Sequence, residues 1–157
     1  MPVADFTQAD SASKVKTMSE ALKFHFDVDG DNFTSAGHAS VEVKKNLRQL
    51  GISPDIIRRV SIAMYEGEIN MVIHAGGGEA DVYVHEDRVE IVLTDHGPGI
   101  PNVELAMKEG FSTAPDNIRS LGFGAGMGLP NMKRYADDMK IDTEFGKGTC
   151  ITMCVKF

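Results

Sequence analysis

Hydrophobic and polar residues follow a strand pattern near the start of the chain and helix patterns after it. From Leu22 to Val28, apolar side chains alternate with polar ones, which predicts a half-buried strand. Apolar residues at helical spacing then predict two helices, over about 36–50 and 53–75. The second should begin at Ser53-Pro54, a capping residue followed by a first-turn proline, and end at three glycines, 76–78.

The rest of the chain is predicted to contain four more strands and two shorter helices. The strands cover 79–85, 88–94, 139–145 and 149–157, and the helices cover 103–109 and 129–138. Because these strands form adjacent pairs joined by short turns, they favour a mixed, mostly antiparallel sheet with helices on one face. We therefore predict an α/β fold, more closely an α+β two-layer sandwich, over residues 22–157. Residues 1–21 are a polar N-terminal extension, for which a disordered tail, a short helix and a strand-like arm are all open interpretations.

The composition is that of an ordinary globular protein. The chain has 157 residues, of which 42% are hydrophobic and 25% charged, enough to bury one core. No apolar run approaches the roughly 20 residues that cross a bilayer, and the first residues lack the apolar core of an export signal. We therefore expect a cytoplasmic protein without a membrane segment. Cys150 and Cys154 are four residues apart in a predicted strand, about 13 Å, too far to form a disulfide with each other.

The chain is acidic, with a formal net charge of −7 from 16 basic and 23 acidic residues. Such a charge repels phosphate backbones, which argues against nucleic-acid binding. Basic residues do gather in the first two predicted helices, where they indicate either a solvated helix face or a docking surface for an acidic partner. These residues are Lys44, Lys45, Arg48, Arg58 and Arg59.

The second predicted helix carries three polar residues at four-residue spacing, Glu66, Asn70 and His74. Most of its other positions are apolar, so burying this stripe would cost several kcal/mol unless the polar groups are used. Either the stripe faces solvent, or Glu66 and Asn70 line a pocket. In a pocket, Asn70 could offer its amide oxygen to a hard cation such as Mg²⁺. Glu66 could deprotonate an attacking hydroxyl or water.

Two glycine-containing segments are further candidates. Asp95-His96-Gly97-Pro98-Gly99 follows a nearly continuous apolar strand. Its carboxylate could accept a hydrogen bond from an exocyclic amine while the glycines let a flat ring approach the backbone, although such a segment alone is commonly a turn. The run from Gly122 to Leu129 has alternate glycines before a helix. Free backbone N–H groups there could cradle phosphates, although glycine density alone also fits a flexible loop.

Taken in order, these segments resemble the Bergerat-fold, or GHKL, ATPases, over about residues 22–157. Within that superfamily the chain is most similar to the bacterial anti-sigma-factor and stress-response serine/threonine kinases, which are free-standing ATP-binding domains of this size. The motifs that carry the resemblance are Glu66 with Asn70, Asp95-x-Gly-x-Gly, Phe111-Ser112-Thr113, Gly126-Met127-Gly128-Leu129 and Gly146-x-Gly-Thr149.

The resemblance implies a role for each matching residue. Glu66 corresponds to the catalytic base, Asn70 to the Mg²⁺ ligand, and Asp95 to the carboxylate that recognises adenine. Arg119 is the candidate for the terminal phosphate, with Lys108 or Lys133 as alternatives. The remaining implied nucleotide contacts are Gly97, Gly99, Gly124, Gly126, Gly128, Leu129 and Thr149.

The function that the resemblance implies is ATP-dependent regulation of a protein partner. We expect a kinase that binds ATP or ADP with Mg²⁺ and phosphorylates a small regulatory protein, to control transcription or stress signalling. That partner could be an anti-anti-sigma-like phosphoacceptor, a sigma factor or a phosphatase. The alternative is an ATP-dependent interaction switch without kinase activity. A homodimer through a sheet edge or the N-terminal extension is compatible with the sequence but not required by it.

Overall fold

The computed structural model describes residues 21–31, 35–108 and 128–157. Its centre is a five-stranded sheet in the order β1-β2-β3-β5-β4, and every neighbouring pair of strands is antiparallel. The strands are β1 (Leu22–Asp29), β2 (Gly77–Val84), β3 (Arg88–Asp95), β4 (Asp138–Glu144) and β5 (Gly148–Lys156). The helices are α1 (His38–Gln49), α2 (Pro54–Ala75), α3 (Val103–Ala106) and α5 (Gly128–Tyr135).

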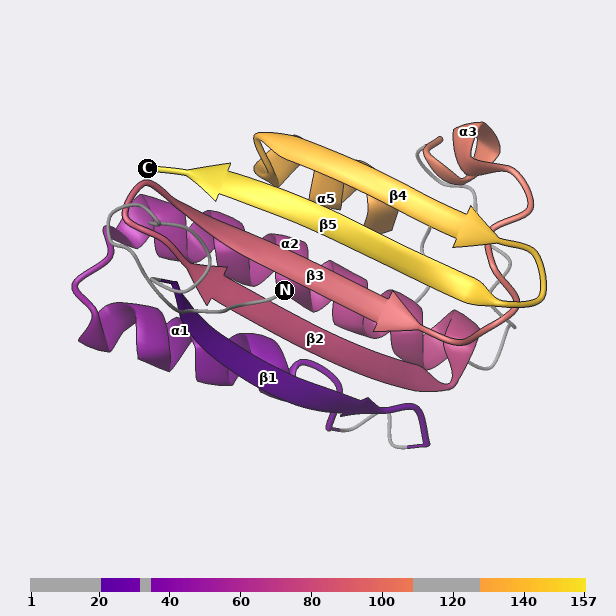
Figure 1. Cartoon of the computed structure of the whole chain (residues 1–157), viewed down its shortest axis with the longest axis horizontal. Coiled ribbons are helices and arrows are strands. Elements are labelled where there is room, and N and C mark those ends of the chain that lie inside the picture. Colours follow the sequence, from indigo (N-terminus) through magenta and orange to yellow (C-terminus); the bar gives the residue numbers. More distant parts are fainter. Residues whose placement is uncertain (1–20, 32–34, 109–127) are drawn as a thin grey trace, which may run out of the picture.

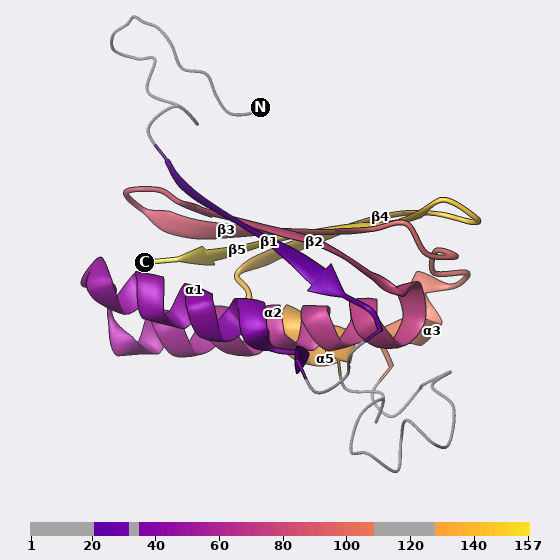
Figure 2. The same ribbon diagram turned by 90° about the horizontal axis from the view of Figure 1, so that it is seen from below.

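The molecule has two layers. Figure 2 shows α1, α2 and α5 lying together on one face of the sheet, and Figure 1 shows that none of the described helices covers the other face. The three central strands, β2, β3 and β5, alternate buried and half-buried positions, so one face of each meets the helices. This arrangement confirms the predicted α/β two-layer fold. No helix in the described part of the chain is both long and apolar enough to span a membrane.

The hydrophobic core fills the space between the sheet and the long helix α2. Small and branched side chains from the strands face medium-sized ones from the helices, which suits close packing of two layers. Residues that are almost fully buried there are Leu47, Val60, Met64, Val82, Val89, Ile91, Leu93, Met132, Met153 and Val155. Cys150 and Cys154 are free and only half-buried, as the prediction against a disulfide between them required.

The element bounds differ from the predicted ones mainly at their ends. Strand β2 begins two residues earlier than predicted, because Gly76 alone ends α2 in a left-handed conformation and Gly77 already pairs with Asp29. Helix α3 stops at Ala106 rather than near 109. Helix α5 ends at Tyr135 rather than 138, because the Asp137 N–H donates to the Cys154 carbonyl and draws the chain into the sheet. The predicted extension, residues 1–21, lies almost wholly outside the described residues.

A buried carboxylate, Glu68, joins α1 to α2. It is 2% exposed, and Oε2 accepts hydrogen bonds of 3.1 Å from the backbone N–H groups of Gly37 and Ala39. Oε1 accepts a third, of 2.8 Å, from the N–H of Ser40. Helix α1 lacks a local side-chain cap, so Glu68 supplies its N-terminal cap from the neighbouring helix. Burial raises the pKa of Glu68, and the three N–H groups oppose that rise.

Replacing Glu68 is expected to destabilise the fold. In Glu68→Gln, the amide NH₂ group faces backbone N–H donors, so buried donors lose their acceptor. We expect the free energy of unfolding to fall by roughly 3 kcal/mol, and the melting temperature by about 6–12 °C. Urea unfolding followed by circular dichroism would measure the change. Glu42→Gln on the surface of α1, which removes only an ion pair with Lys45, is the matched control. Equal stability of the two variants would contradict the capping role.

Candidate functional site

Asp95 lies at the end of β3, where the sheet meets an irregular segment. Its Oδ1 accepts hydrogen bonds from the backbone N–H groups of Gly97, at 3.0 Å, and Thr149, at 3.2 Å. Among the described residues, Oδ2 has no hydrogen-bond partner. One carboxylate oxygen is therefore fixed by the protein, and the other is available to accept a hydrogen bond from a ligand.

The predicted site residue Thr149 lies beside Asp95, as the pairing of β3 with β5 requires. Thr149 is 7% exposed, and its Oγ1 is 2.9 Å from Oγ1 of Thr143 on β4. Thr143 in turn accepts a hydrogen bond of 2.8 Å from the N–H of Ile100. Thr149 thus connects the carboxylate of Asp95 to the segment that follows it, through its backbone N–H to Asp95 and its hydroxyl to Thr143. Either hydroxyl can be the donor in this contact, because a hydroxyl can both donate and accept.

Gly97 and Gly99 are required by close contacts with the rest of the protein. A Cβ atom on Gly97 would come within 2.6 Å of the Cβ of Ala75, at the end of α2. Gly99 has φ +84°, and a Cβ there would approach the carbonyl oxygen of Glu144 to 2.6 Å. The glycines therefore hold the turn after Asp95 between α2 and the β4–β5 hairpin. A role in admitting a flat ring stays a prediction.

Glu66 and Asn70 are half-buried on α2, whereas His74, the third member of the stripe, is exposed. Helix α5 lies beside Glu66 and Asn70. Asn131 on α5 donates a hydrogen bond of 3.0 Å from Nδ2 to Oε2 of Glu66. A Cβ on Gly128 would lie 2.9 Å from Oδ1 of Asn70, so only glycine fits there without displacing the amide. The stripe is thus partly covered by α5.

The remaining predicted site residues fall in two groups. Leu129 is 6% exposed and packs in the core, so its backbone rather than its side chain is the part that a ligand could reach. Lys108 and Lys133, the alternatives for the terminal phosphate, are both exposed. Arg119, Gly124 and Gly126 lie outside the described residues, and their roles stay predictions.

The described candidate residues are distributed along the second half of α2. Gly97 contacts Ala75 at the end of this helix, Gly128 contacts Asn70, and Glu66 is one turn further back. Nine residues of helix separate Glu66 from Ala75, which is roughly 13 Å along its axis. The candidate residues therefore extend along this helix, from Glu66 to the turn that follows Asp95.

Sequence reasoning missed two residues that hold the candidate site in place. Thr143 could have been found from the predicted final hairpin, because a short turn places it opposite Thr149. Asn131 gave no usable signal, because its contact with Glu66 depends on how α5 lies against α2. Both residues support polar groups of the site through single hydrogen bonds.

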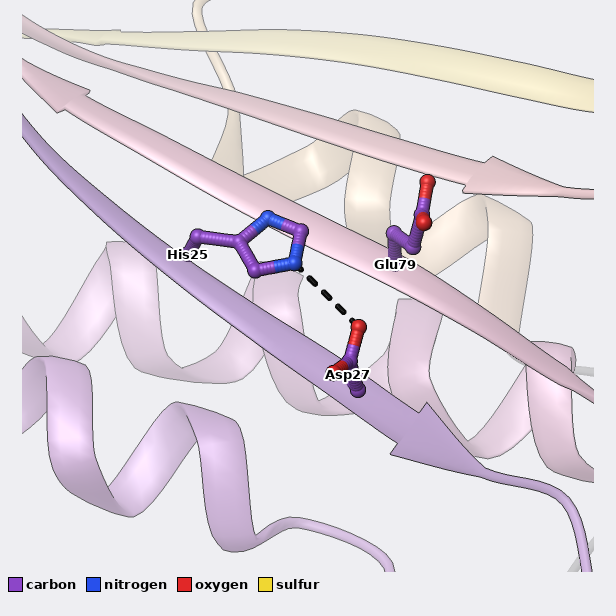
Figure 3. Close-up of side chains that lie close together, drawn as sticks. All are labelled: His25, Asp27 and Glu79. Atoms are coloured by element: carbon purple, nitrogen blue, oxygen red, sulfur yellow. Dashed lines mark hydrogen bonds and ion pairs between the residues drawn. The ribbon is translucent and has the colours of Figure 1, made fainter.

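A second group of polar side chains lies on the open face of the sheet (Figure 3). Antiparallel pairing places His25 opposite Asp81 and Asp27 opposite Glu79. His25 Nδ1 is 2.6 Å from Asp81 Oδ1, and its Nε2 is 3.2 Å from Asp27 Oδ1. Hydrogen bonding to Asp81, supported by Asp27, raises the pKa of His25. We interpret this group as a surface ion-pair network that stabilises the β1–β2 pair.

The ion pairs of His25 predict a stability term that depends on pH. The charged groups facing it are Lys23 and Asp27 on β1 and Glu79 and Asp81 on β2. Because folding raises the pKa of His25 above its usual 6.5, the stabilisation is complete below that pH. It is lost as the pH rises through the folded-state value. Urea unfolding would compare the wild type with His25→Gln between pH 5.5 and 8.5. The free energy of unfolding of the wild type should fall relative to that of the variant over this range, by less than about 1 kcal/mol. An unchanged difference across that range would contradict the ion pairs.

Comparison with known proteins places the chain in a family. Residues 55–157 match the family described as histidine kinase-, DNA gyrase B-, and HSP90-like ATPase. The anti-sigma F factor of Clostridium acetobutylicum is 35% identical over 141 residues, covering 87% of this chain and 92% of that protein. The anti-sigma F factor of Clostridium beijerinckii is 34% identical, covering 76% and 84%. The serine/threonine-protein kinase RsbT of Bacillus subtilis is 32% identical, covering 65% and 74%.

The matched region contains most of the geometry described above. It begins at the second residue of α2 and runs to the end of the chain, so it includes Glu66, Asn70, Asp95 and Thr149. The structure of the mycobacterial sensor histidine kinase MprB matches with a TM-score of 0.49 and 21% identity, covering 86% of this chain and 97% of that structure. This structural similarity is too weak to support the family assignment. On the family match and the curated relatives, the chain belongs to the histidine kinase-, DNA gyrase B- and HSP90-like ATPases, and it is similar along most of its length to anti-sigma F factors.

Proposed function

We propose that this chain is an ATP-dependent serine/threonine protein kinase of the anti-sigma type. It binds ATP between α2 and the end of β3 and transfers the γ-phosphate to a small regulatory protein in the cytoplasm. Such a partner is an anti-anti-sigma-like phosphoacceptor, a sigma factor or a phosphatase. Relatives named anti-sigma F factor and serine/threonine-protein kinase support this proposal.

The observation that carries the proposal is the arrangement of Glu66 and Asn70 beside α5. A carboxylate and an amide, both half-buried, lie one helical turn apart on α2. Along the helix axis, Glu66 is roughly 13 Å from Ala75, which contacts the turn that follows the candidate adenine contact Asp95. The arrangement suits phosphoryl transfer, which needs a base and phosphate-binding groups at the far end of the nucleotide.

Asp95 is proposed to recognise the adenine ring. Its fixed orientation directs Oδ2 to accept a hydrogen bond from the exocyclic amine, and Thr149 with Thr143 supplies hydroxyls nearby. Guanine carries a carbonyl oxygen where adenine carries that amine, so a carboxylate acceptor disfavours it. We therefore expect ATP and ADP to bind and GTP to bind far more weakly.

The residues beside α5 fit a magnesium ion that accompanies ATP. The Asn70 amide makes no hydrogen bond within the described part of the chain, and Gly128 leaves room beside it where a Cβ would not fit. Its amide oxygen is a hard donor of the kind that Mg²⁺ prefers. Asn70 is therefore the proposed protein ligand. When bound, Mg²⁺ offsets the negative charge of the phosphates.

Glu66 is proposed as the general base. Its carboxylate takes the proton from a serine or threonine hydroxyl of the partner, whose oxygen forms a bond to the γ-phosphorus. The bond from that phosphorus to the β–γ bridging oxygen breaks, and ADP leaves with the electron pair. Arg119, Gly124 and Gly126 are proposed phosphate contacts on the basis of the family resemblance alone.

A labelled-phosphate experiment tests this proposal. The full chain would be incubated with Mg²⁺, ATP carrying a labelled γ-phosphate, and small regulatory proteins that co-purify with it. Transfer of label to a serine or threonine supports the kinase. Nucleotide-dependent binding of a partner with no transfer would instead support the interaction switch. Absence of ATP binding by the folded chain would overturn both.

A further inference from the structure

Glu66 is held by one side chain in the described part of the protein. Asn131, on the first turn of α5, donates from Nδ2 to Glu66 Oε2 at 3.0 Å, and both residues are half-buried. A carboxylate can only accept, so the amide nitrogen of Asn131 must face Glu66. The amide oxygen then faces a guanidinium nitrogen of Arg134, at 3.4 Å, which can only donate. Chemistry at both ends thus fixes the orientation of this amide.

The same helix supports Asn70. Gly128 lies against the Asn70 amide and Asn131 against the Glu66 carboxylate. The two residues are three apart on α5, and their partners are four apart on α2, so each pair lies on one helix face. Helix α5 is packed firmly beside α2 through Met132, which is fully buried, and Gly67, whose hypothetical Cβ would lie 3.5 Å from the Met132 sulfur. Helix α5 therefore holds both polar residues of the stripe in place.

We infer that Asn131 is a positioning residue for the Glu66 carboxylate. This inference rests on the proposed function, in which Glu66 takes a proton from the attacking hydroxyl. By occupying Oε2, Asn131 leaves Oε1 as the atom that receives the proton, and it fixes the direction in which Oε1 points.

The test measures the titration of Glu66 directly. Protein labelled with ¹³C at the glutamate carboxyls would be titrated by NMR in the wild type, Asn131→Leu and Asn131→Asp. Asn131→Leu removes the donor, so we expect the Glu66 midpoint of that variant to rise above that of the wild type. In the nearly isosteric Asn131→Asp, a second carboxylate faces the first, so the rise should be larger. Tyr135→Phe, on the same helix, removes only a hydroxyl and is the control.

The kinetic counterpart is the pH dependence of γ-phosphate release from ATP. The acid limb of the profile should move to higher pH in the order wild type, Asn131→Leu, Asn131→Asp, with ATP affinity changed less than about threefold. A merely structural role for Asn131 would lower the rate equally at every pH and leave the Glu66 titration in place.

The two readouts separate failure of this inference from failure of the proposed function. Coincident Glu66 titrations in the wild type and in folded Asn131→Asp overturn the positioning role, whatever the activity. The variants could instead show shifted Glu66 titrations in a chain that binds ATP but neither releases nor transfers phosphate. That result would support the Asn131–Glu66 contact and overturn the proposed kinase activity. Circular dichroism of each variant establishes that the compared proteins are folded.

Discussion

Asp95→Asn is expected to lower the affinity for ATP by about 100-fold or more. In the wild type, Oδ1 accepts from the N–H groups of Gly97 and Thr149. An asparagine must keep its oxygen on those two donors, which turns its NH₂ group toward the ligand. A donor then faces the exocyclic amine of adenine, and a hydrogen bond is replaced by a repulsive contact.

Calorimetric titration of ATP and ADP, with and without Mg²⁺, would measure this effect. Asp142→Asn is a suitable control, because Asp142 is an exposed residue on β4 that pairs with Lys140. We expect the control to bind ATP like the wild type. Wild-type affinity in a folded Asp95→Asn chain would contradict the adenine contact, whereas loss of binding in both variants would point to damage to the sheet.

Glu66→Gln is expected to reduce phosphotransfer by about 10²- to 10⁴-fold while changing ATP affinity only slightly. Glutamine keeps the shape of the side chain, and its amide oxygen can still accept from Asn131. It cannot take a proton from the attacking hydroxyl. Glu66→Ala should lose transfer to the same extent, which would separate the missing base from any loss of the Asn131 contact.

Single-turnover transfer of a labelled γ-phosphate, with ATP binding measured in parallel, checks this prediction. Glu42→Gln, on the exposed side of α1, controls for a change of charge alone. Regulation of the partner that survives Glu66→Gln without any transfer would favour the interaction switch. Transfer at the wild-type rate would show that another group acts as base.

Most of the fold was predictable from local patterns. The alternation in 22–28, the capping pair Ser53-Pro54 and the glycines after Ala75 act over a few residues, so periodicity and backbone preference suffice to identify them. The observed β1 and α2 begin and end within about one residue of the predicted bounds. Ends determined by tertiary contacts were less predictable, as at α5, where Asp137 pairs with β5.

The candidate site divides in the same way. Residue type, order and the resemblance to the GHKL ATPases selected Glu66, Asn70, Asp95 and the glycines as candidates. The stripe of α2 left two interpretations open. Only the tertiary structure showed that α5 lies against Glu66 and Asn70 and leaves both side chains half-buried.

What the sequence determined by itself is the order of the elements, the two-layer fold and a set of candidate side chains for the site. The tertiary structure decided which partners hold those side chains. Asn131 is 65 residues from Glu66, and Thr149 is 54 from Asp95. Glu68 caps a helix whose first residues lie about 30 positions before it. Such contacts depend on how helices and strands pack against one another, and no local pattern records that packing.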